Sequence, residues 1–211
     1  MRKKDSFDTF RVRPGTTVRL KDYDPAWAGF GDMKKLDKDQ MKKRAQAFLR
    51  KNLADLSEAQ ELLWAGDSYS LLIILQAMDA AGKDGLIKHV MSGVNPMGCH
   101  AASFKAPSAE ELDHDFLWRC AKQLPERGKI GIFNRSYYEE VLVVRVHPEY
   151  LEWQKLPPGK RGQSFWEKRF EDINTFERHL VRNGTIILKF FLHVSKSEQK
   201  KRFLERLDNP G

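Results

Sequence analysis

The segment from Gln76 to Gly85, Gln-Ala-Met-Asp-Ala-Ala-Gly-Lys-Asp-Gly, carries the residue types of a phosphate-binding turn. It follows a continuous apolar run of strand length, residues 71–75, and it precedes a helical pattern. A helix N-terminus offers free N–H groups and the positive end of the helix dipole. Gly82 would let the backbone approach an anion closely, and Lys83 could reach the outer phosphates as a point charge. We therefore predict that phosphates bind at this turn.

The turn departs from the usual G-x-x-x-x-G-K-S/T pattern at two positions. Ala77 occupies the place of the first glycine, and Asp84 replaces the Ser or Thr that normally touches Mg²⁺. The second predicted strand, residues 129–133, is followed by Asn134-Arg135-Ser136, where an ordinary P-loop enzyme has an aspartate. Both standard metal ligands are therefore replaced. A tight strand-to-helix turn that binds no ligand is the alternative interpretation of this segment.

A carboxylate for the metal would then have to come from elsewhere, because chemistry on phosphate chains needs a divalent cation to neutralise developing charge. Asp79 lies inside the turn, and a bridging Mg²⁺ would explain a carboxylate that faces an anion. Glu139 and Glu140, just past the second strand, are further candidates. Arg135 would lie at the carboxyl edge of the sheet, where its fork suits bidentate phosphate contact. The alternative for Arg135 is an ordinary salt bridge.

Strand and helix patterns alternate along the chain, which predicts a three-layer α/β domain with a mainly parallel sheet. Residues 1–36 are irregular and basic, and we expect them to form an N-terminal arm that packs on the domain of residues 37–211. Residues 137–145 suit a strand and a helix equally. The predicted helices cover residues 37–64, 83–91, 108–122, 164–182 and 195–207, and the predicted strands cover residues 71–75, 100–104, 129–133 and 185–194.

Composition and charge set the broad class of the protein. Hydrophobic residues make up 41% and charged residues 31%, which is a globular composition with enough apolar residues for a core. We expect no transmembrane helix, because no stretch reaches 18 apolar residues, and no signal peptide is expected. Cys99 and Cys120 are expected to be reduced and structural, in a cytoplasmic protein. The net charge of +8 favours an anionic partner, although many enzymes are mildly basic without special reason.

Two segments, Met78–Gly85 and Phe133–His147, together resemble the polyphosphate kinase 2 family. Residues 103–112, 114–119 and 197–206 extend the resemblance, which spans most of the chain from about residue 11 onward and is most similar to the class III branch. It implies a P-loop kinase fold related to thymidylate kinase, with a helical lid at about 148–165 and 195–211. It also implies reversible, Mg²⁺-dependent transfer of the terminal phosphoryl group of inorganic polyphosphate to AMP, ADP or both, which makes ADP or ATP.

The resemblance also implies roles for particular residues. Asp79 matches the family's essential loop aspartate, which positions Mg²⁺ and the acceptor phosphate. Lys83 matches the phosphate-binding lysine, and Arg135 matches the arginine after the second strand. The expected catalytic residues are Asp79, Lys83 and Arg135. Phosphate or polyphosphate would be bound by Ala81, Gly82, Lys83, Asp84, Gly85, Lys88, Lys105 and Arg135, with Lys200 as a further lid residue. Nucleotide would be bound by Asn134, Glu139 and Arg202. Magnesium, for which Mn²⁺ could substitute, would be bound by Asp79 and also by Glu139.

The resemblance predicts a homodimer or homotetramer, with polyphosphate and AMP, ADP or ATP as partners and neither nucleic acid nor a membrane. Family chains usually continue for several dozen residues beyond the point that corresponds to Gly211, so the lid of this chain is expected to be incomplete. One alternative is an ATP-dependent nucleotide kinase of the same fold. Another is a basic protein that binds nucleic acid through residues 42–51, Phe48 and Trp64, although these aromatic residues fall at core spacing. A third is a regulatory module that only binds polyphosphate.

Overall fold

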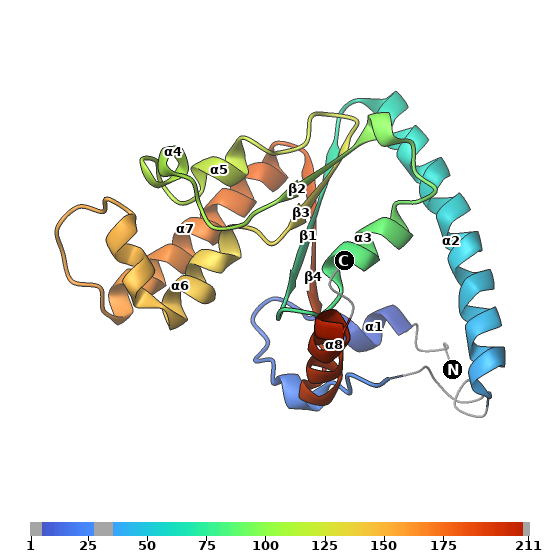
Figure 1. The fold of residues 1–211 in the computed structure, drawn as a ribbon. Helices are drawn as coiled ribbons and strands as arrows, with labels where there is room; N and C mark the ends of the chain where they lie inside the picture. The colour runs from blue at the N-terminus through green and yellow to red at the C-terminus, as the bar shows by residue number, and fades with distance from the viewer. Residues whose placement is uncertain (1–5, 28–35, 209–211) are drawn as a thin grey trace. The chain divides into compact units, whose positions relative to one another are not determined.

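The structure is a computed structural model that describes residues 6–27 and 36–208. Helices and strands alternate through most of the described chain, as the sequence predicts (Figure 1). The α-helices are α1 (Ser6–Phe10), α2 (Lys38–Gly66), α3 (Lys83–Val90), α4 (Ala109–Leu112), α5 (Trp118–Ala121), α6 (Val143–Val146), α7 (Gln163–Arg182) and α8 (Lys196–Asp208). The strands are β1 (Ser70–Ala77), β2 (Cys99–Ser103), β3 (Ile130–Asn134) and β4 (Thr185–Leu192). Short 3-10 helices are η1 (Leu20–Asp22), η3 (Pro96–Gly98), η4 (Tyr137–Val141) and η5 (Pro148–Trp153).

The four strands form one sheet in the order β2-β3-β1-β4, and every neighbouring pair is parallel. Leu75 of β1 pairs with Asn134 of β3 on one side and with Phe190 of β4 on the other. Ser103, the last residue of β2, also pairs with Asn134. The carboxyl ends of β2 and β3 therefore lie level, next to the end of β1. This edge is where ligands bind in open α/β sheets, and the predicted α/β fold with a parallel sheet is confirmed.

Helices cover both faces of the sheet because successive side chains of a strand point to opposite sides. Leu72 and Ile74 of β1 belong to a core that includes residues from β3, α5, η4 and α7. Leu71, Ile73 and Leu75 belong to a second core, with side chains from α3 and the carboxyl-terminal part of α2. The two cores make the predicted three layers, and they fix the strand ends that carry the candidate site.

The chain divides into two compact units. The first contains the described residues of 1–52, 78–81 and 193–208, and the second contains residues 53–77 and 82–192 with the whole sheet. The predicted arm includes α1 and η1, whereas its residues 1–5 and 28–35 lie outside the described residues. The packing of the arm and the two lid segments stay predictions.

The structure corrects the prediction of one helix over residues 108–122. Two short helices, α4 and α5, stand there instead. Ser108 begins α4 with the predicted capping box, but Asp115 interrupts the helix, because its Oδ1 accepts the backbone N–H of Leu117 at 2.9 Å. A side chain that satisfies a nearby backbone N–H competes with helix continuation in this way. Residues 137–145, which suited a strand and a helix equally, are helical, and the Ser136 hydroxyl accepts the first free N–H, that of Tyr138.

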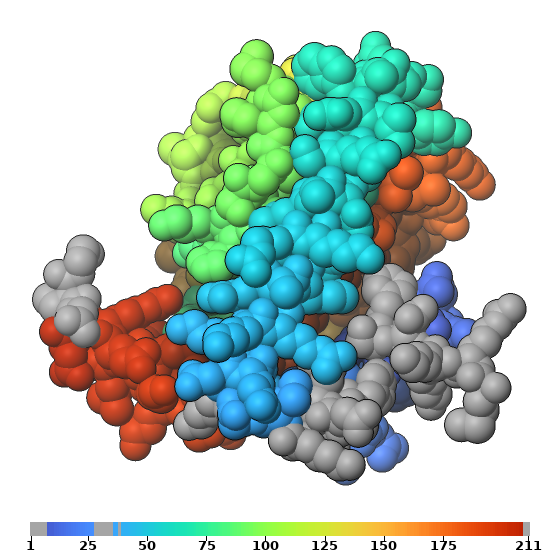
Figure 2. All heavy atoms as spheres, turned by 90° about the vertical axis from the view of Figure 1, so that its right-hand side faces the viewer, coloured from blue at the N-terminus to red at the C-terminus, as the bar shows by residue number. Residues whose placement is uncertain are grey.

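Helix α2 confirms the predicted helix but not the predicted burial of its aromatic residues. Phe48 is 65% exposed and Trp64 is 48% exposed, so the expectation from their core spacing is wrong. Atoms of α2 lie at the surface along the face drawn in Figure 2. The side chain that is most buried in α2 is polar, Gln60, at 3% exposure.

Two further expectations can be compared with the described residues. No helix within residues 6–27 and 36–208 is long and apolar enough to cross a membrane. Cys99 and Cys120 are both free thiols, and Cys120 is buried. Burial raises the pKa of the Cys120 thiol to about 12, which agrees with the expected structural role.

Candidate active site

The turn after β1 presents Lys83 as the first residue of α3. Gly82, which precedes it, has φ +93° and ψ +28°, a left-handed conformation that glycine adopts without steric cost. The helix starts here because the Gly82 carbonyl accepts the Leu86 N–H at 3.0 Å. The Lys83 Nζ donates to the carbonyl of Ala77, the last residue of β1, at 3.3 Å. The lysine is thus folded back over the end of its own strand.

The preceding residues of the turn, 78–81, belong to the other compact unit, together with α8. Asp79 is exposed, and its backbone carbonyl accepts the Gln199 Nε2 at 2.8 Å. Arg202 Nη1 donates to the carbonyl of Ala80 at 3.2 Å, and its Nε donates to Glu198 at 2.8 Å. Ala80 has φ +59°, which is rare for a residue with a side chain. Helix α8 therefore places Arg202, a predicted site residue, beside the segment that carries Asp79.

The end of β3 places Arg135 beside the end of β1. Its N–H donates to the Leu75 carbonyl at 3.0 Å, which continues the pairing of the two strands by one residue. Arg135 has φ +67°, so the chain turns sharply there in the left-handed region. Such a conformation is strained for a residue other than glycine, and strain of this kind concentrates at functional sites. The guanidinium side chain remains 38% exposed, within reach of a ligand at the sheet edge.

Asn134 and Asp84, the two departures from the usual P-loop pattern, are in direct contact. The Asn134 Nδ2 donates to the Asp84 Oδ1 at 2.5 Å. Asn134 is only 9% exposed, whereas Asp84 is exposed in the first turn of α3. The contact joins the carboxyl end of β3 to the amino end of α3.

Glu139 lies against the same turn. Its Oε2 is 3.8 Å from the Arg135 Nη1. The buried Gln76 amide lies between Ser136 and Glu139, oriented so that its nitrogen donates to Glu139 Oε1 at 2.9 Å and its oxygen accepts the Ser136 hydroxyl at 3.0 Å and the Ser136 N–H at 3.2 Å. This orientation satisfies both the donor and the acceptor of the amide. Neither Gln76 nor Ser136 was predicted from the sequence to position other residues. The available signal was a glutamine at the end of an otherwise apolar strand.

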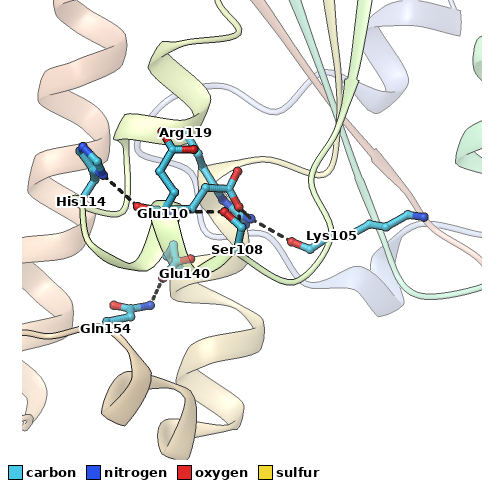
Figure 3. Close-up of polar contacts among 8 residues, drawn as sticks. Lys105, Ser108, Glu110, His114, Arg119, Glu140 and Gln154 are labelled. Atoms are coloured by element: carbon cyan, nitrogen blue, oxygen red, sulfur yellow. Dashed lines mark hydrogen bonds and ion pairs between the residues drawn. The ribbon is translucent and has the colours of Figure 1, made fainter.

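The structure does not gather every predicted residue at the turn. Lys88 lies in the last turn of α3, five residues after Lys83, so the two side chains leave the helix about 140° apart. Lys105 is two residues past β2 and exposed. Its backbone carbonyl accepts the Arg119 Nη1 at 2.9 Å, while its side chain points away from that cluster (Figure 3). Gly85 and the lid residue Lys200 are exposed on α3 and α8.

A second polar cluster lies beyond the ends of β2 and β3, around a cavity of about 80 Å³ (Figure 3). Arg119, 8% exposed, lies 3.6 Å from the Glu111 carboxylate and above the Phe104 ring. Glu140 accepts the Gln154 Nε2 at 2.6 Å. The cavity is lined by Pro107, Glu111, Leu112, His114, Asp115, Phe116, Arg119, Glu140, Gln154 and Leu156.

Glu140 also forms the most buried ion pair described. Its Oε2 accepts the Arg169 Nη1 at 3.0 Å, and the two side chains are 6% and 4% exposed. Burial lowers the pKa of Arg169 from its usual value, and the Glu140 charge opposes that shift. The Arg169 Nη2 donates to Gln154 Oε1 at 2.5 Å. These polar groups satisfy one another, and their contacts join η4, α7 and the residue that follows η5. Glu140, a metal candidate from the sequence, therefore points into the protein.

The described oxygen ligands suit a hard divalent cation that is bound mainly through its substrate. Among the described residues, no group of three or more His, Cys, Asp or Glu side chains could hold a metal ion. Magnesium in phosphoryl transfer is usually bound by one or two carboxylates, waters and substrate phosphates. The exposed carboxylate of Asp84, in the unit that contains the sheet, has oxygen donors of that kind, and so does Asp79 in the other unit. Glu139 is held between Gln76 and Arg135, which favours a positioning role for it.

A parallel sheet with a Gly-Lys turn after an interior strand and an arginine after the neighbouring strand defines a P-loop kinase fold. The family model for polyphosphate kinase 2 matches residues 35–211. The chain belongs to the polyphosphate kinase 2 family.

Relatives and solved structures agree with this assignment. The chain is 58% identical over 170 residues to an ADP-polyphosphate phosphotransferase of Rhodopseudomonas palustris, covering 80% of this chain and 59% of the relative. It is 47% identical over 205 residues to an AMP/ADP-polyphosphate phosphotransferase of Meiothermus ruber, covering 95% of this chain and 68% of the relative. The crystal structure of polyphosphate kinase 2 from Arthrobacter aurescens TC1 superposes with a TM-score of 0.80 at 40% identity, covering 96% of this chain and 66% of that one. The chain thus spans about three fifths to two thirds of the length of these relatives.

Proposed function

We propose that the protein transfers the terminal phosphoryl group of inorganic polyphosphate to AMP, ADP or both, reversibly and with Mg²⁺. The observation that carries this proposal is the placement of Lys83 and Arg135 after two paired strands in a member of the polyphosphate kinase 2 family. Polyphosphate as the donor is supported by the names of the two relatives above, an ADP-polyphosphate and an AMP/ADP-polyphosphate phosphotransferase. The net charge of +8 is that of a protein with anionic substrates.

The side chains that follow the strand ends neutralise the charge of the phosphates and hold them in position. Lys83 at the start of α3 neutralises phosphate oxygens as a point charge, assisted by the positive end of the helix. The Arg135 guanidinium exchanges its contact with Glu139 for the transferred phosphoryl group, which it binds through two N–H groups. This contact suits the charge that is distributed over the phosphoryl oxygens in a loose transition state. The reaction is a direct in-line transfer between two phosphates, so it needs no covalent intermediate on the protein.

Asp79 would hold Mg²⁺, or Mn²⁺ in its place, and a bound cation neutralises charge that develops on the phosphate oxygens. Arg202 orients the loop that carries Asp79 through the Ala80 carbonyl, and it would meet the nucleotide from α8. Asn134 and Glu139 would border the nucleotide phosphate. The homo-oligomeric assembly and the cytoplasmic location stay predictions.

A donor assay tests the proposal. The protein is incubated with Mg²⁺, polyphosphate and either AMP or ADP, and new ADP and ATP are measured; a parallel set replaces polyphosphate with ATP. We expect product from polyphosphate and little transfer from ATP to AMP. Transfer from ATP alone would support the nucleotide-kinase alternative, and binding of polyphosphate without turnover would support the regulatory alternative.

A lysine outside the predicted site gives a matched control for that assay. Lys83→Met should reduce turnover by about 100-fold or more, the scale of losing one transition-state contact. Lys168→Met, at an exposed position on α7, should change turnover by less than about threefold, because a lysine outside the predicted site acts only through long-range charge. Equal losses in the two variants would contradict the assignment of Lys83.

A further inference from the structure

Two residues of the site have exchanged chemical types relative to the usual P-loop arrangement. In an ordinary P-loop enzyme a Ser or Thr follows the lysine, and an aspartate ends the neighbouring strand. Here Asp84 follows Lys83, and the amide Asn134 ends β3. The two are in contact, since the Asn134 Nδ2 donates to the Asp84 Oδ1 at 2.5 Å. Both arrangements pair one carboxylate with one neutral hydrogen-bonding side chain. In the usual arrangement the carboxylate is on the strand, whereas here it is on the helix.

We propose that the magnesium-binding carboxylate of this site has been transposed from the strand to the helix, so that Asp84 binds the cation and Asn134 positions Asp84. The inference rests on the proposed function and makes it more specific. It gives the cation a ligand within the unit that contains the sheet, and it gives Asn134 a role other than contact with nucleotide.

The geometry of the pair suits this division of roles. Asn134 is 9% exposed and fixed in the sheet by its pairing with Leu75 and Ser103, so its amide is a rigid donor. The amide donates to Oδ1 of Asp84, whereas Oδ2 of Asp84 has no hydrogen-bond partner among the described residues. Carboxylate ligands of metals are commonly oriented by a hydrogen bond to one oxygen while the other binds. An aspartate at position 134 would be a poorer orienter, because two carboxylates at this separation repel each other.

The position of Asp84 also leaves its carboxylate open to a cation. Asp84 lies in the first turn of α3, where the helix dipole stabilises negative charge. It is exposed, so a hydrated cation can approach it. The adjacent Lys83 directs its Nζ to the Ala77 carbonyl at 3.3 Å. Asp84 therefore has the charge, the access and the orientation that a magnesium ligand needs, within the same compact unit as Lys83 and Arg135.

A transposition experiment tests the proposal with three variants. Asp84→Asn removes the charge and keeps an amide oxygen for Asn134. Asn134→Asp puts a second carboxylate opposite the first. The double variant Asp84→Asn/Asn134→Asp moves the carboxylate back to the strand and keeps the hydrogen bond in reversed sense. Asp55→Asn, at an exposed position on α2, is the control for loss of one negative charge.

Manganese binding is the decisive readout, because it does not depend on turnover. The affinity for Mn²⁺ is measured by electron paramagnetic resonance, with Mn²⁺ alone and with Mn²⁺ plus inorganic triphosphate. We expect Asp84→Asn to weaken binding about 10- to 100-fold, the range for loss of a group that holds a metal or its ligands. The double variant should recover at least about tenfold of that loss, and Asp55→Asn should bind as the parent does. Thermal melts establish that each variant is folded.

Two results would overturn the proposal: unchanged Mn²⁺ affinity in Asp84→Asn, or a double variant no better than Asp84→Asn. Either result would mean that the Asp84–Asn134 hydrogen bond has only a structural role, connecting α3 to β3. The donor assay, run on the same samples, separates this failure from failure of the proposed function. If the parent protein transfers phosphate from polyphosphate but Asp84→Asn still binds Mn²⁺ with the parent's affinity, the proposed function stands. Only the assignment of Asp84 as a metal ligand is then wrong.

Discussion

Glu139 and Glu140 are neighbours in η4, and each faces an arginine, but the two ion pairs differ in geometry and burial. The Glu139 Oε2 lies 3.8 Å from Arg135, whose side chain is 38% exposed. The Glu140 Oε2 lies 3.0 Å from Arg169, and both of these side chains are less than 10% exposed. One step along the chain therefore separates a loose pair at the sheet edge from a closed pair in the interior.

The difference separates a partly exposed arginine from one that is enclosed by its partners. The Arg135 side chain is 38% exposed and lies 3.8 Å from its Glu139 partner, so under the proposed function a phosphate could displace that carboxylate from the guanidinium. Arg169 donates to both Glu140 and Gln154 and lies within 5 Å of the Phe116 and Phe165 ring centres. Taking it out of this cluster would leave a buried carboxylate unpaired, so Arg169 stabilises the fold that positions Arg135.

The largest effect is expected from the buried pair. Glu140→Gln leaves the Arg169 charge uncompensated in the interior, and we expect the free energy of unfolding to fall by about 3–5 kcal/mol. Glu139→Gln, the neighbouring substitution, should cost less than about 1 kcal/mol because its partner is partly exposed. Urea unfolding followed by circular dichroism measures both. Equal costs would contradict the distinction between the two pairs.

A double variant sharpens the same comparison. Glu140→Met/Arg169→Met replaces the buried pair with apolar side chains and removes both charges together. It should be less destabilised than Glu140→Gln alone, since no buried charge is left without a partner. A double variant that unfolds more easily than Glu140→Gln would mean that the hydrogen bonds to Gln154, and not the charge balance, dominate this cluster.

The second prediction concerns Arg135, which combines an exposed guanidinium with φ +67°. Arg135→Gly and Arg135→Ala both remove the charge, and each should reduce turnover by about 100-fold or more. The glycine variant should nevertheless be more stable than the alanine variant by about 1 kcal/mol, because only alanine keeps the left-handed strain. Turnover with polyphosphate and thermal unfolding of the two variants give the two readouts. An alanine variant as stable as the glycine variant would show that the turn is unstrained.

Local signals in the sequence were sufficient to predict most of the fold. The apolar run at 71–75 and the Gly82-Lys83 pair predicted a strand and the turn after it, because a buried parallel strand is apolar on both faces and a left-handed turn favours glycine. The alternation of strands and helices predicted the parallel sheet. The break at Asp115 was missed because a single side-chain hydrogen bond decides it, against a helical pattern that continues on both sides.

The polar contacts of the site could not be predicted because they depend on strand register. Asn134 meets Asp84, and Gln76 meets Glu139, only because Leu75 pairs with Asn134. A shift by one residue would turn each of these side chains to the other face of the sheet. Residue type alone does not distinguish Glu139 from Glu140, since both are glutamates, and only the family resemblance pointed to Glu139.

The third prediction uses two buried glutamines. Gln76→Leu removes the amide that holds Glu139 and Ser136, so we expect about a tenfold loss of turnover and a loss of about 1–2 kcal/mol in stability. Gln60→Leu is the matched control, because the Oε1 of this 3% exposed residue has no hydrogen-bond partner among the described residues. The control should keep its turnover and lose little or no stability. Comparable turnover losses in the two variants would rule out a specific positioning role for Gln76.

The last prediction concerns the effect of alkaline pH on stability through groups on the buried side of η4. Burial raises the pKa of Cys120 to about 12 from its ordinary value of 9.0, and it raises the pKa of Tyr138 to about 12 from 10.0. Between pH 9 and 12 the unfolded chain therefore releases protons that the folded chain retains, so stability falls as pH rises, by about 1.4 kcal/mol per pH unit for each fully titrating proton.

Cys120→Ala isolates the cysteine contribution to this loss. The variant should be less stable than the parent at pH 8, because the substitution leaves a cavity in the core, yet it should lose less stability between pH 9 and 11. Urea unfolding at a series of pH values gives both quantities. Cys99→Ala, at the less buried thiol, should reduce the slope by a smaller amount, because burial raises the pKa of Cys99 as well but its side chain is only partly enclosed. Parallel stability curves for Cys120→Ala and the parent would mean that the thiol is open to solvent, and that the interior next to Glu140 is less closed than the surroundings of Arg169 require.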